Sequence, residues 1–182
     1  MNPWLLLDKY YPPADPAREI LFAHSRAVAA KALAVARRLA PCESVDLSFV
    51  EEAALLHDIG IRFVQAPAIG CHGDLPYLAH GYKGRELLEA EGWPHHALVC
   101  ERHIGVGLSA ATIRAQHLPL PLRDMIPETR EETIIAYADL FFSKGESELT
   151  VEKSLARVRQ GVARFGAENL AIFERWHALF AA

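Results

Sequence analysis

The chain has 182 residues, 51% of them hydrophobic, and its formal net charge is −4 with histidine neutral. These values suit a single domain with a substantial core, and the acidic balance argues against a protein that binds nucleic acid through a broad basic surface. The three cysteines form no CxxC pair, which fits a reducing compartment, and no apolar run approaches the roughly 20 residues of a membrane-spanning helix. We therefore expect a cytoplasmic protein with no nucleic-acid or membrane partner.

The spacing of apolar residues, interrupted by proline and glycine, predicts an all-α fold of about eight helices with no internal repeat. In chain order, helices are expected at residues 3–11, 15–39, 46–58, 80–91, 94–103, 109–117, 128–142, 149–165 and 167–180, with loops at 61–78 and 118–127. No alternating apolar–polar run is long enough for a convincing strand. Residues 1–182 are expected to form one domain, with a core at about 16–144 and terminal helices at 149–182 packed on it.

Two helix starts carry capping signals. Asp15 is expected to cap the long second helix, with Pro16 at its first position, where the missing N–H group has no cost. The third helix is expected to begin at Asp46 or at Ser48, because Ser48 and Glu51 have the spacing of a capping box. These two helices also carry buried polar side chains, which are described next.

Four polar residues stand out in helices that are otherwise apolar around them. His24 lies on the inward stripe of the second helix, the doublet His57-Asp58 ends the third, and Asp139 lies within the apolar run 134–142. Taken singly, His24 would be a core histidine and the doublet a solvated helix end. Together, two imidazoles and two carboxylates form a mixed nitrogen–oxygen ligand set. Such a set suits an ion of Mn, Fe, Co, Ni or Zn, and also Mg if few nitrogens bind.

The order of these residues resembles that of the HD-domain superfamily of metal-dependent phosphohydrolases. The motif in this chain is His24, then His57-Asp58, then Asp139. The resemblance implies an HD-domain-like helical bundle and the hydrolysis of a phosphate ester or anhydride. It further implies that Asp58 and Asp139 are catalytic, since they would hold the attacking water and accept its proton. The expected partner is a nucleotide or another small phosphorylated metabolite.

A small uncharacterised subgroup of predicted hydrolases with the His-Asp-Ile-Gly motif is similar over longer stretches. The stretches that match this subgroup are residues 80–84, 101–108 and 127–132, whereas residues 53–60 and 136–140 match the superfamily around its motif. Some superfamily members bind a second metal ion through additional histidines. The resemblance places His80 and His103 in that role, with Asp58 bridging both ions. The alternative is that His80 only starts a helix and that His103 hydrogen-bonds the substrate phosphate.

Phosphate binding requires positive charge beside the metal. Arg102, next to His103, is the first candidate for a phosphate clamp, and the others are Arg62, Lys83, Arg26 and Lys144. Many superfamily members carry a lysine two residues after the glycine of the doublet motif, where this chain has Arg62. The sequence therefore leaves open which basic side chain neutralises the phosphate.

Two further histidines are possible accessory residues. His72 lies in a glycine-flanked loop and could donate a proton, although a solvated loop histidine is the alternative. His96 stands two helical turns before His103, although a surface pair with His95 fits equally well.

Two other functions remain open at this stage. One is a di-iron oxygenase of the HD type, which would need His80 and His103 as true ligands. The other is a non-catalytic regulatory module stabilised by its metal. The terminal helices carry apolar residues at helical spacing, which predicts packing on the core or a homodimer surface.

Overall fold

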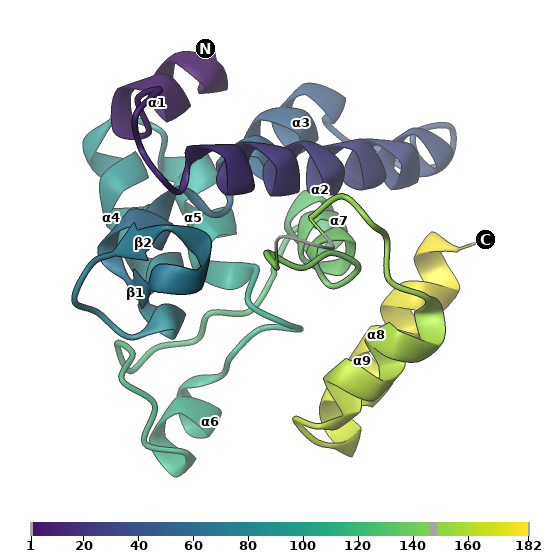
Figure 1. Cartoon of the computed structure of the whole chain (residues 1–182). Coiled ribbons are helices and arrows are strands. Elements are labelled where there is room, and N and C mark those ends of the chain that lie inside the picture. Colours follow the sequence, from purple (N-terminus) through teal and green to yellow (C-terminus); the bar gives the residue numbers. More distant parts are fainter. Residues whose placement is uncertain (1, 146–148, 182) are drawn as a thin grey trace.

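The computed structural model describes residues 2–145 and 149–181, and most of its regular structure is helical (Figure 1). The α-helices of these residues are α1 (Pro3–Tyr10), α2 (Arg18–Leu39), α3 (Leu47–Leu56), α4 (His80–Ala90), α5 (Pro94–Arg102), α6 (Ala110–Ala115), α7 (Arg130–Asp139), α8 (Leu155–Ala163) and α9 (Ala167–Phe180). This architecture confirms the predicted all-α fold. Across the described ranges, no helix combines the length and apolar character that a membrane crossing requires.

The segment predicted as the first loop contains short regular elements. They are the 3-10 helices η1 (Ile59–Phe63), η2 (Pro67–Ile69) and η3 (Tyr77–Ala79) and the strands β1 (Gln65–Ala66) and β2 (Cys71–His72). The strands pair antiparallel, with Gln65 opposite His72. Gly70 turns the chain between them at φ 73°, a conformation that favours glycine. Strands of two residues carry no readable alternation, so the sequence could not indicate this ribbon.

The structure corrects the predicted start of α2 and decides between the two predicted starts of α3. Asp15 accepts a hydrogen bond from the Ala17 N–H at 2.9 Å, and α2 begins only at Arg18, so Pro16 precedes the helix. Asp46 caps α3, because its side chain accepts from the Phe49 N–H at 3.0 Å. The Asp46 alternative is therefore confirmed over the Ser48 capping box. Short polar side chains take either position, and only the backbone geometry decides between them.

Two clusters of buried apolar side chains hold the helices together. The larger cluster joins α2, α3, α7, α8 and α9 and contains Phe173 and Phe180, which are 0% and 1% exposed. The second cluster joins α1, η1, α4 and α5. Helix α2 contributes Val28 to the first cluster and Leu21 to the second, so His24 lies between them. The single-domain organisation and the homodimer stay predictions.

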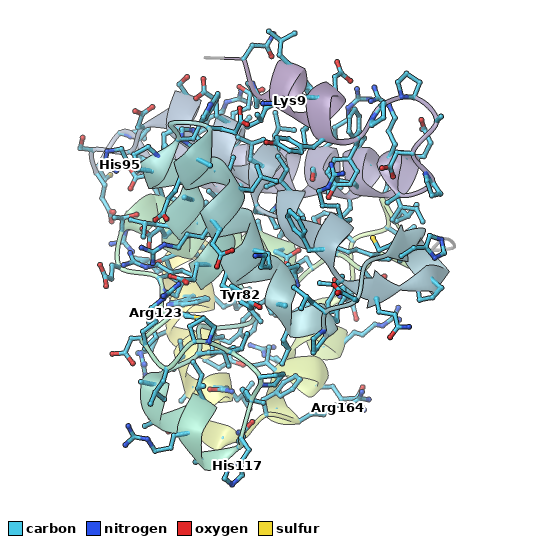
Figure 2. All side chains as sticks on the ribbon, turned by 90° about the vertical axis from the view of Figure 1, so that its left-hand side faces the viewer. Lys9, Tyr82, His95, His117, Arg123 and Arg164 are labelled. Carbon is cyan, nitrogen blue, oxygen red and sulfur yellow. The ribbon has the colours of Figure 1, made fainter. Side chains whose placement is uncertain are left out.

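Residues 104–129 form an arm that carries α6 away from the body (Figure 1). Figure 2 shows His117 at the far end of this arm and Arg123 nearer to the body. The buried carboxylate of Glu101 pairs with Arg123 of the arm and with Arg85 of α4. A carboxylate 1% exposed is stable only when it is paired, so these two arginines fix the base of the arm next to His103.

Candidate metal centre

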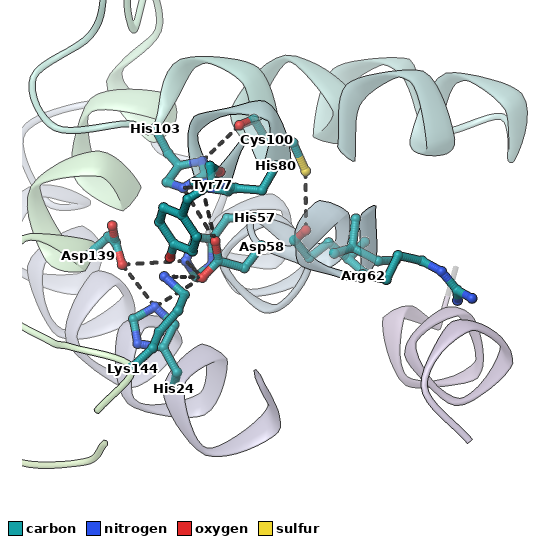
Figure 3. A network of polar contacts seen from close by, with 12 residues as sticks. His24, His57, Asp58, Arg62, Tyr77, His80, Cys100, His103, Asp139 and Lys144 are labelled. Carbon is teal, nitrogen blue, oxygen red and sulfur yellow. Dashed lines mark hydrogen bonds and ion pairs between the residues drawn. The ribbon is translucent and has the colours of Figure 1, made fainter. Parts of the chain in front are cut away.

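Five helices deliver six polar side chains to one buried point (Figure 3). The six residues are His24 in the middle of α2, His57 and Asp58 directly after α3, His80 at the start of α4, His103 directly after α5, and Asp139 at the end of α7. The structure therefore brings together every residue that the sequence predicted as a ligand of the first or the second ion.

Close backbone contacts hold the histidine-bearing ends of the helices together. An added Cβ at Gly60 would lie 2.0 Å from the carbonyl oxygen of His80 and 2.5 Å from the nitrogen of Gly84. An added Cβ at Gly84 would lie 3.2 Å from the Cβ of Cys100. Glycine is thus needed where η1 meets α4, and it also allows α4 to approach α5 closely.

The first set of ligand atoms comes from His24, His57, Asp58 and Asp139. The Nε2 atom of His24 lies 3.2 Å from Asp58 Oδ2 and 2.9 Å from Asp139 Oδ1. The Nε2 atom of His57 lies 3.0 Å and 3.5 Å from the same two oxygens. One ligand atom from each residue falls within 4.8 Å of all the others, which is compact enough to surround a single ion. Two nitrogens and two oxygens suit a divalent transition metal.

The second set shares Asp58 with the first. The other oxygen of Asp58, Oδ1, lies 3.4 Å from His80 Nε2 and 3.6 Å from His103 Nε2. The two imidazole nitrogens are 3.2 Å apart. Asp58 thus turns one carboxylate oxygen toward each set, which is the arrangement that a bridging ligand requires.

Backbone carbonyls fix the orientation of three of the four imidazoles. The Nδ1–H groups of His57, His80 and His103 donate to the carbonyl oxygens of the residues three positions earlier, at 2.7, 2.6 and 2.8 Å. A carbonyl can only accept, so Nδ1 carries the hydrogen and Nε2 faces the cluster. Histidine ligands of metals are commonly oriented in this way by a partner on the other ring nitrogen.

Burial leaves several of these polar atoms without hydrogen bonds. The exposed fraction of the side chain is at most 4% for five of the six residues and 18% for Asp139. Among the described residues, both ring nitrogens of His24, the Nε2 of His57 and both oxygens of Asp58 make no hydrogen bond of regular geometry, although Asp58 contacts both imidazoles and Lys144 as ion pairs. Buried polar atoms are nearly always satisfied, so their convergence fits a bound cation.

The electrostatics of the cluster also favour a cation. Burial opposes charge on each group, yet the neighbouring cations His57 and Lys144 hold the pKa of Asp58 well below its usual range. Burial is likewise outweighed at His57, where the carboxylates of Asp58 and Asp139 raise the pKa to about 10. At His80 burial prevails and lowers the pKa to about 4, so this imidazole is neutral at physiological pH and ready to act as a ligand.

Of the five predicted phosphate-binding residues, Lys144 is the one that contacts the cluster. Its Nζ atom lies 2.6 Å from Asp58 Oδ2, and its side chain is 13% exposed. The first candidate, Arg102, is instead held by Glu132 at 3.0 Å and by Glu128 at 3.1 Å. Although Arg102 is adjacent to His103 in the sequence, its guanidinium is engaged by these two carboxylates and does not contact the cluster, so its role as a phosphate clamp stays a prediction.

The other three basic candidates have partners elsewhere. Arg62 donates to the carbonyl of Tyr10, and in Figure 3 its side chain points away from the cluster. Lys83 forms an ion pair with Glu86 on the surface of α4. Arg26 lies over the ring of Trp4, 4.9 Å from its centroid.

The two predicted accessory histidines do not join the cluster. His72 is exposed on β2. The Nε2 atom of His96 lies 3.2 Å from a carboxylate oxygen of Glu52, and its ring packs edge-on against Phe49 and Trp93. His95 is exposed on the outer surface (Figure 2), so only His96 of this pair is engaged by the fold.

Tyr77 is a neighbour of the centre that sequence reasoning missed. Its carbonyl accepts the hydrogen bond from His80, and its ring lies 4.8 Å from the imidazole of His80. Its hydroxyl interacts with Lys144. The available signal was position, since Tyr77 precedes His80 by three residues at the start of a helix.

Comparisons with known proteins agree with this geometry. A family model described as HD domain matches residues 21–142. The chain is 31% identical over 156 residues to the tRNA (cytidine(56)-2'-O)-methyltransferase of Thermoplasma volcanium, covering 85% of this chain and 41% of that protein. It is 36% identical over 106 residues to the enzyme of the same name from Picrophilus torridus, covering 58% of this chain and 27% of that protein.

An uncharacterized protein of Methanocaldococcus jannaschii is 40% identical over 96 residues, covering 52% of this chain and 49% of that protein. The chain thus spans less than half the length of these curated relatives. The crystal structure of the HD domain of the L. monocytogenes phosphodiesterase PgpH has a similar fold, with a TM-score of 0.55 and 17% sequence identity. That match covers 96% of this chain and 95% of the other. The match of the family model over residues 21–142 shows that the chain belongs to the HD domain family.

Proposed function

We propose that the protein is a metal-dependent phosphohydrolase that cleaves a phosphate ester or anhydride of a nucleotide or another small phosphorylated metabolite. The observation that carries this proposal is Asp58, whose two oxygens face two separate sets of imidazole nitrogens. Membership of the HD domain family supports a divalent metal at this point. Four imidazoles among the six converging residues favour Mn, Fe, Co, Ni or Zn over Mg.

The two carboxylates of the centre differ in exposure, and this difference assigns them different roles. Divalent ions held there would polarise a phosphoryl oxygen and lower the pKa of water. Asp139 is the most exposed of the six residues, so its carboxylate is placed to orient an incoming water and accept its proton. Asp58 is fully buried, and its carboxylate contacts the four imidazoles of His24, His57, His80 and His103 and thereby fixes their positions. The buried walls exclude bulk water, which strengthens every charge interaction inside.

One alternative chemistry and one alternative substrate class rest on specific observations. The convergence of His80 and His103 on Asp58 completes the six-residue set that a di-iron oxygenase of the HD type would use. Iron content, colour and O₂ consumption of protein purified without added metal test that chemistry. The names of two relatives favour a phosphate ester carried by tRNA as a second substrate class.

A phosphoester screen combined with metal analysis tests the main proposal. We expect wild-type protein to hydrolyse members of a panel of nucleotides, sugar phosphates and terminally phosphorylated tRNA fragments with Mn, Co, Ni, Fe, Zn or Mg. Asp58→Ala should lose metal and turnover together. Metal-dependent turnover that survives in Asp58→Ala would contradict the proposal.

A further inference from the structure

The metal centre is accessible from one side. The side chains of His24, His57 and Asp58 are at most 1% exposed, whereas Asp139 is 18% exposed. Two further residues with exposed atoms, Tyr77 and Lys144, adjoin the same carboxylates. In Figure 3 the ring of Tyr77 lies across the cluster, with Lys144 beside it. A substrate phosphate that approaches the exposed part of Asp139 therefore lies beside these two side chains.

The fold holds Tyr77 firmly at this entrance. Its carbonyl accepts the Nδ1–H of His80 at 2.6 Å, and its ring packs on the imidazole of His80 at 4.8 Å. The residue is nevertheless 40% exposed, so part of it reaches solvent beside the centre. The hydroxyl faces Lys144. Burial raises its pKa, and the carboxylates of Asp58 and Asp139 act in the same direction. It is thus a fixed hydrogen-bond donor at the edge of the cluster.

Lys144 supplies the positive charge at the same place. Its ammonium lies 2.6 Å from Asp58 Oδ2 and also interacts with Asp139 and Tyr77. An ammonium has three donors, so contacts with one carboxylate oxygen and with the Tyr77 hydroxyl leave one donor for a further acceptor. The predicted alternatives Arg102, Arg62, Lys83 and Arg26 are each held by other partners.

We propose that Tyr77 and Lys144 form a clamp that binds a terminal phosphate group at the open side of the metal centre. The inference rests on the proposed function and deepens it by naming a substrate class. A phosphate monoester presents three unsubstituted oxygens to the hydroxyl, the ammonium and the centre. A diester carries a second substituent, which the buried walls around Asp58 and His57 oppose. The clamp therefore selects terminal phosphates over internal phosphodiesters.

Binding of inorganic phosphate to the metal-loaded full chain, measured by calorimetry, tests the clamp directly. Tyr77→Phe keeps the ring on His80 and removes only the hydroxyl, so we expect affinity to fall about tenfold, the effect of one hydrogen bond to a charged acceptor. Lys144→Gln removes a charge-assisted contact, and we expect a loss of about tenfold or more. The matched controls are Tyr82→Phe on α4 and Lys9→Gln on α1, both labelled in Figure 2. Neither control should change phosphate affinity.

Metal content and substrate preference complete the experiment. Both clamp variants should keep the wild-type metal content, and their kcat/KM should fall more for p-nitrophenyl phosphate than for bis(p-nitrophenyl) phosphate. Unchanged phosphate affinity in both variants would overturn the clamp while leaving the proposed function standing. Loss of metal from the variants would also overturn it, because the residues would then support the metal centre itself. A wild-type protein that neither binds phosphate nor hydrolyses any ester would overturn both proposals.

Discussion

Replacing Gly60 with alanine perturbs the contact that joins the two histidine sets. The new Cβ would start 2.0 Å from the carbonyl oxygen of His80 and 2.9 Å from the Cα of Gly84. These are backbone atoms, so no side chain can turn away to make room. Separating the methyl group from His80 to an ordinary 3.4 Å requires a movement of about 1.4 Å between η1 and α4. This movement is a substantial fraction of the 3.4 Å between Asp58 Oδ1 and His80 Nε2, so it would disturb their contact.

The expected cost follows from the size of this clash. Overpacking a rigid contact destabilises a protein by about 1–3 kcal/mol, and the backbone origin of this clash places Gly60→Ala at the upper end, near 3 kcal/mol. For a protein of this length, that cost corresponds to a fall in Tm of about 6–12 °C. Because the movement pulls His80 away from Asp58, metal content should fall as well.

Gly161→Ala is the matched control for this substitution. Gly161 lies inside α8 and has nothing within 4 Å of an added Cβ. Alanine there should raise stability by about 0.5–1 kcal/mol, because it favours the helical backbone. Differential scanning calorimetry and metal analysis of both variants check the prediction. A Gly60→Ala protein with wild-type Tm and metal content would refute the reasoning.

Two further predictions concern the centre itself. His103→Ala should remove a ligand of the second set, so we expect the metal content to fall toward one ion and turnover to fall by about 100-fold or more, since outer-shell partners alone cost 10–100-fold; unaltered stoichiometry by mass spectrometry would rule out a role as ligand. Metal affinity should rise with pH, because the pKa of His57, about 10, requires this imidazole to release a proton on binding, whereas His80, with a pKa of about 4, is already neutral. Titration with Co²⁺ between pH 6 and 9 should show a gain of at most about tenfold per pH unit, and a flat profile would count against His57 as a ligand.

The sequence was most informative where periodicity and burial act together. His24 stands on an apolar stripe, so its inward position followed from helical spacing. Asp139 lies in an apolar run, so a buried carboxylate could be expected, and the structure places its carboxylate at the cluster, 18% exposed. The order of the four motif residues then gave the fold, which the structure confirms.

Features that depend on long-range placement were beyond sequence reasoning. Arg102 and Lys144 have the same charge, and only the tertiary structure shows that the first is held by Glu132 and the second by Asp58. Tyr77 carries no motif, and its importance comes from the turn that lays its ring on His80. The missed ribbon at β1 and β2 likewise depends on pairing between residues rather than on any pattern within a strand.

Asp58 contacts both sets of imidazoles, so the proposed metal centre depends on it most directly. The decisive measurement is metal stoichiometry by mass spectrometry together with metal-dependent phosphoester turnover, for wild-type protein and Asp58→Ala in parallel. We expect wild-type protein to hold one or two divalent ions and to turn over a phosphoester, and Asp58→Ala to lose both properties while keeping its helical circular-dichroism spectrum. A folded Asp58→Ala protein with wild-type metal content and turnover would contradict the central claim.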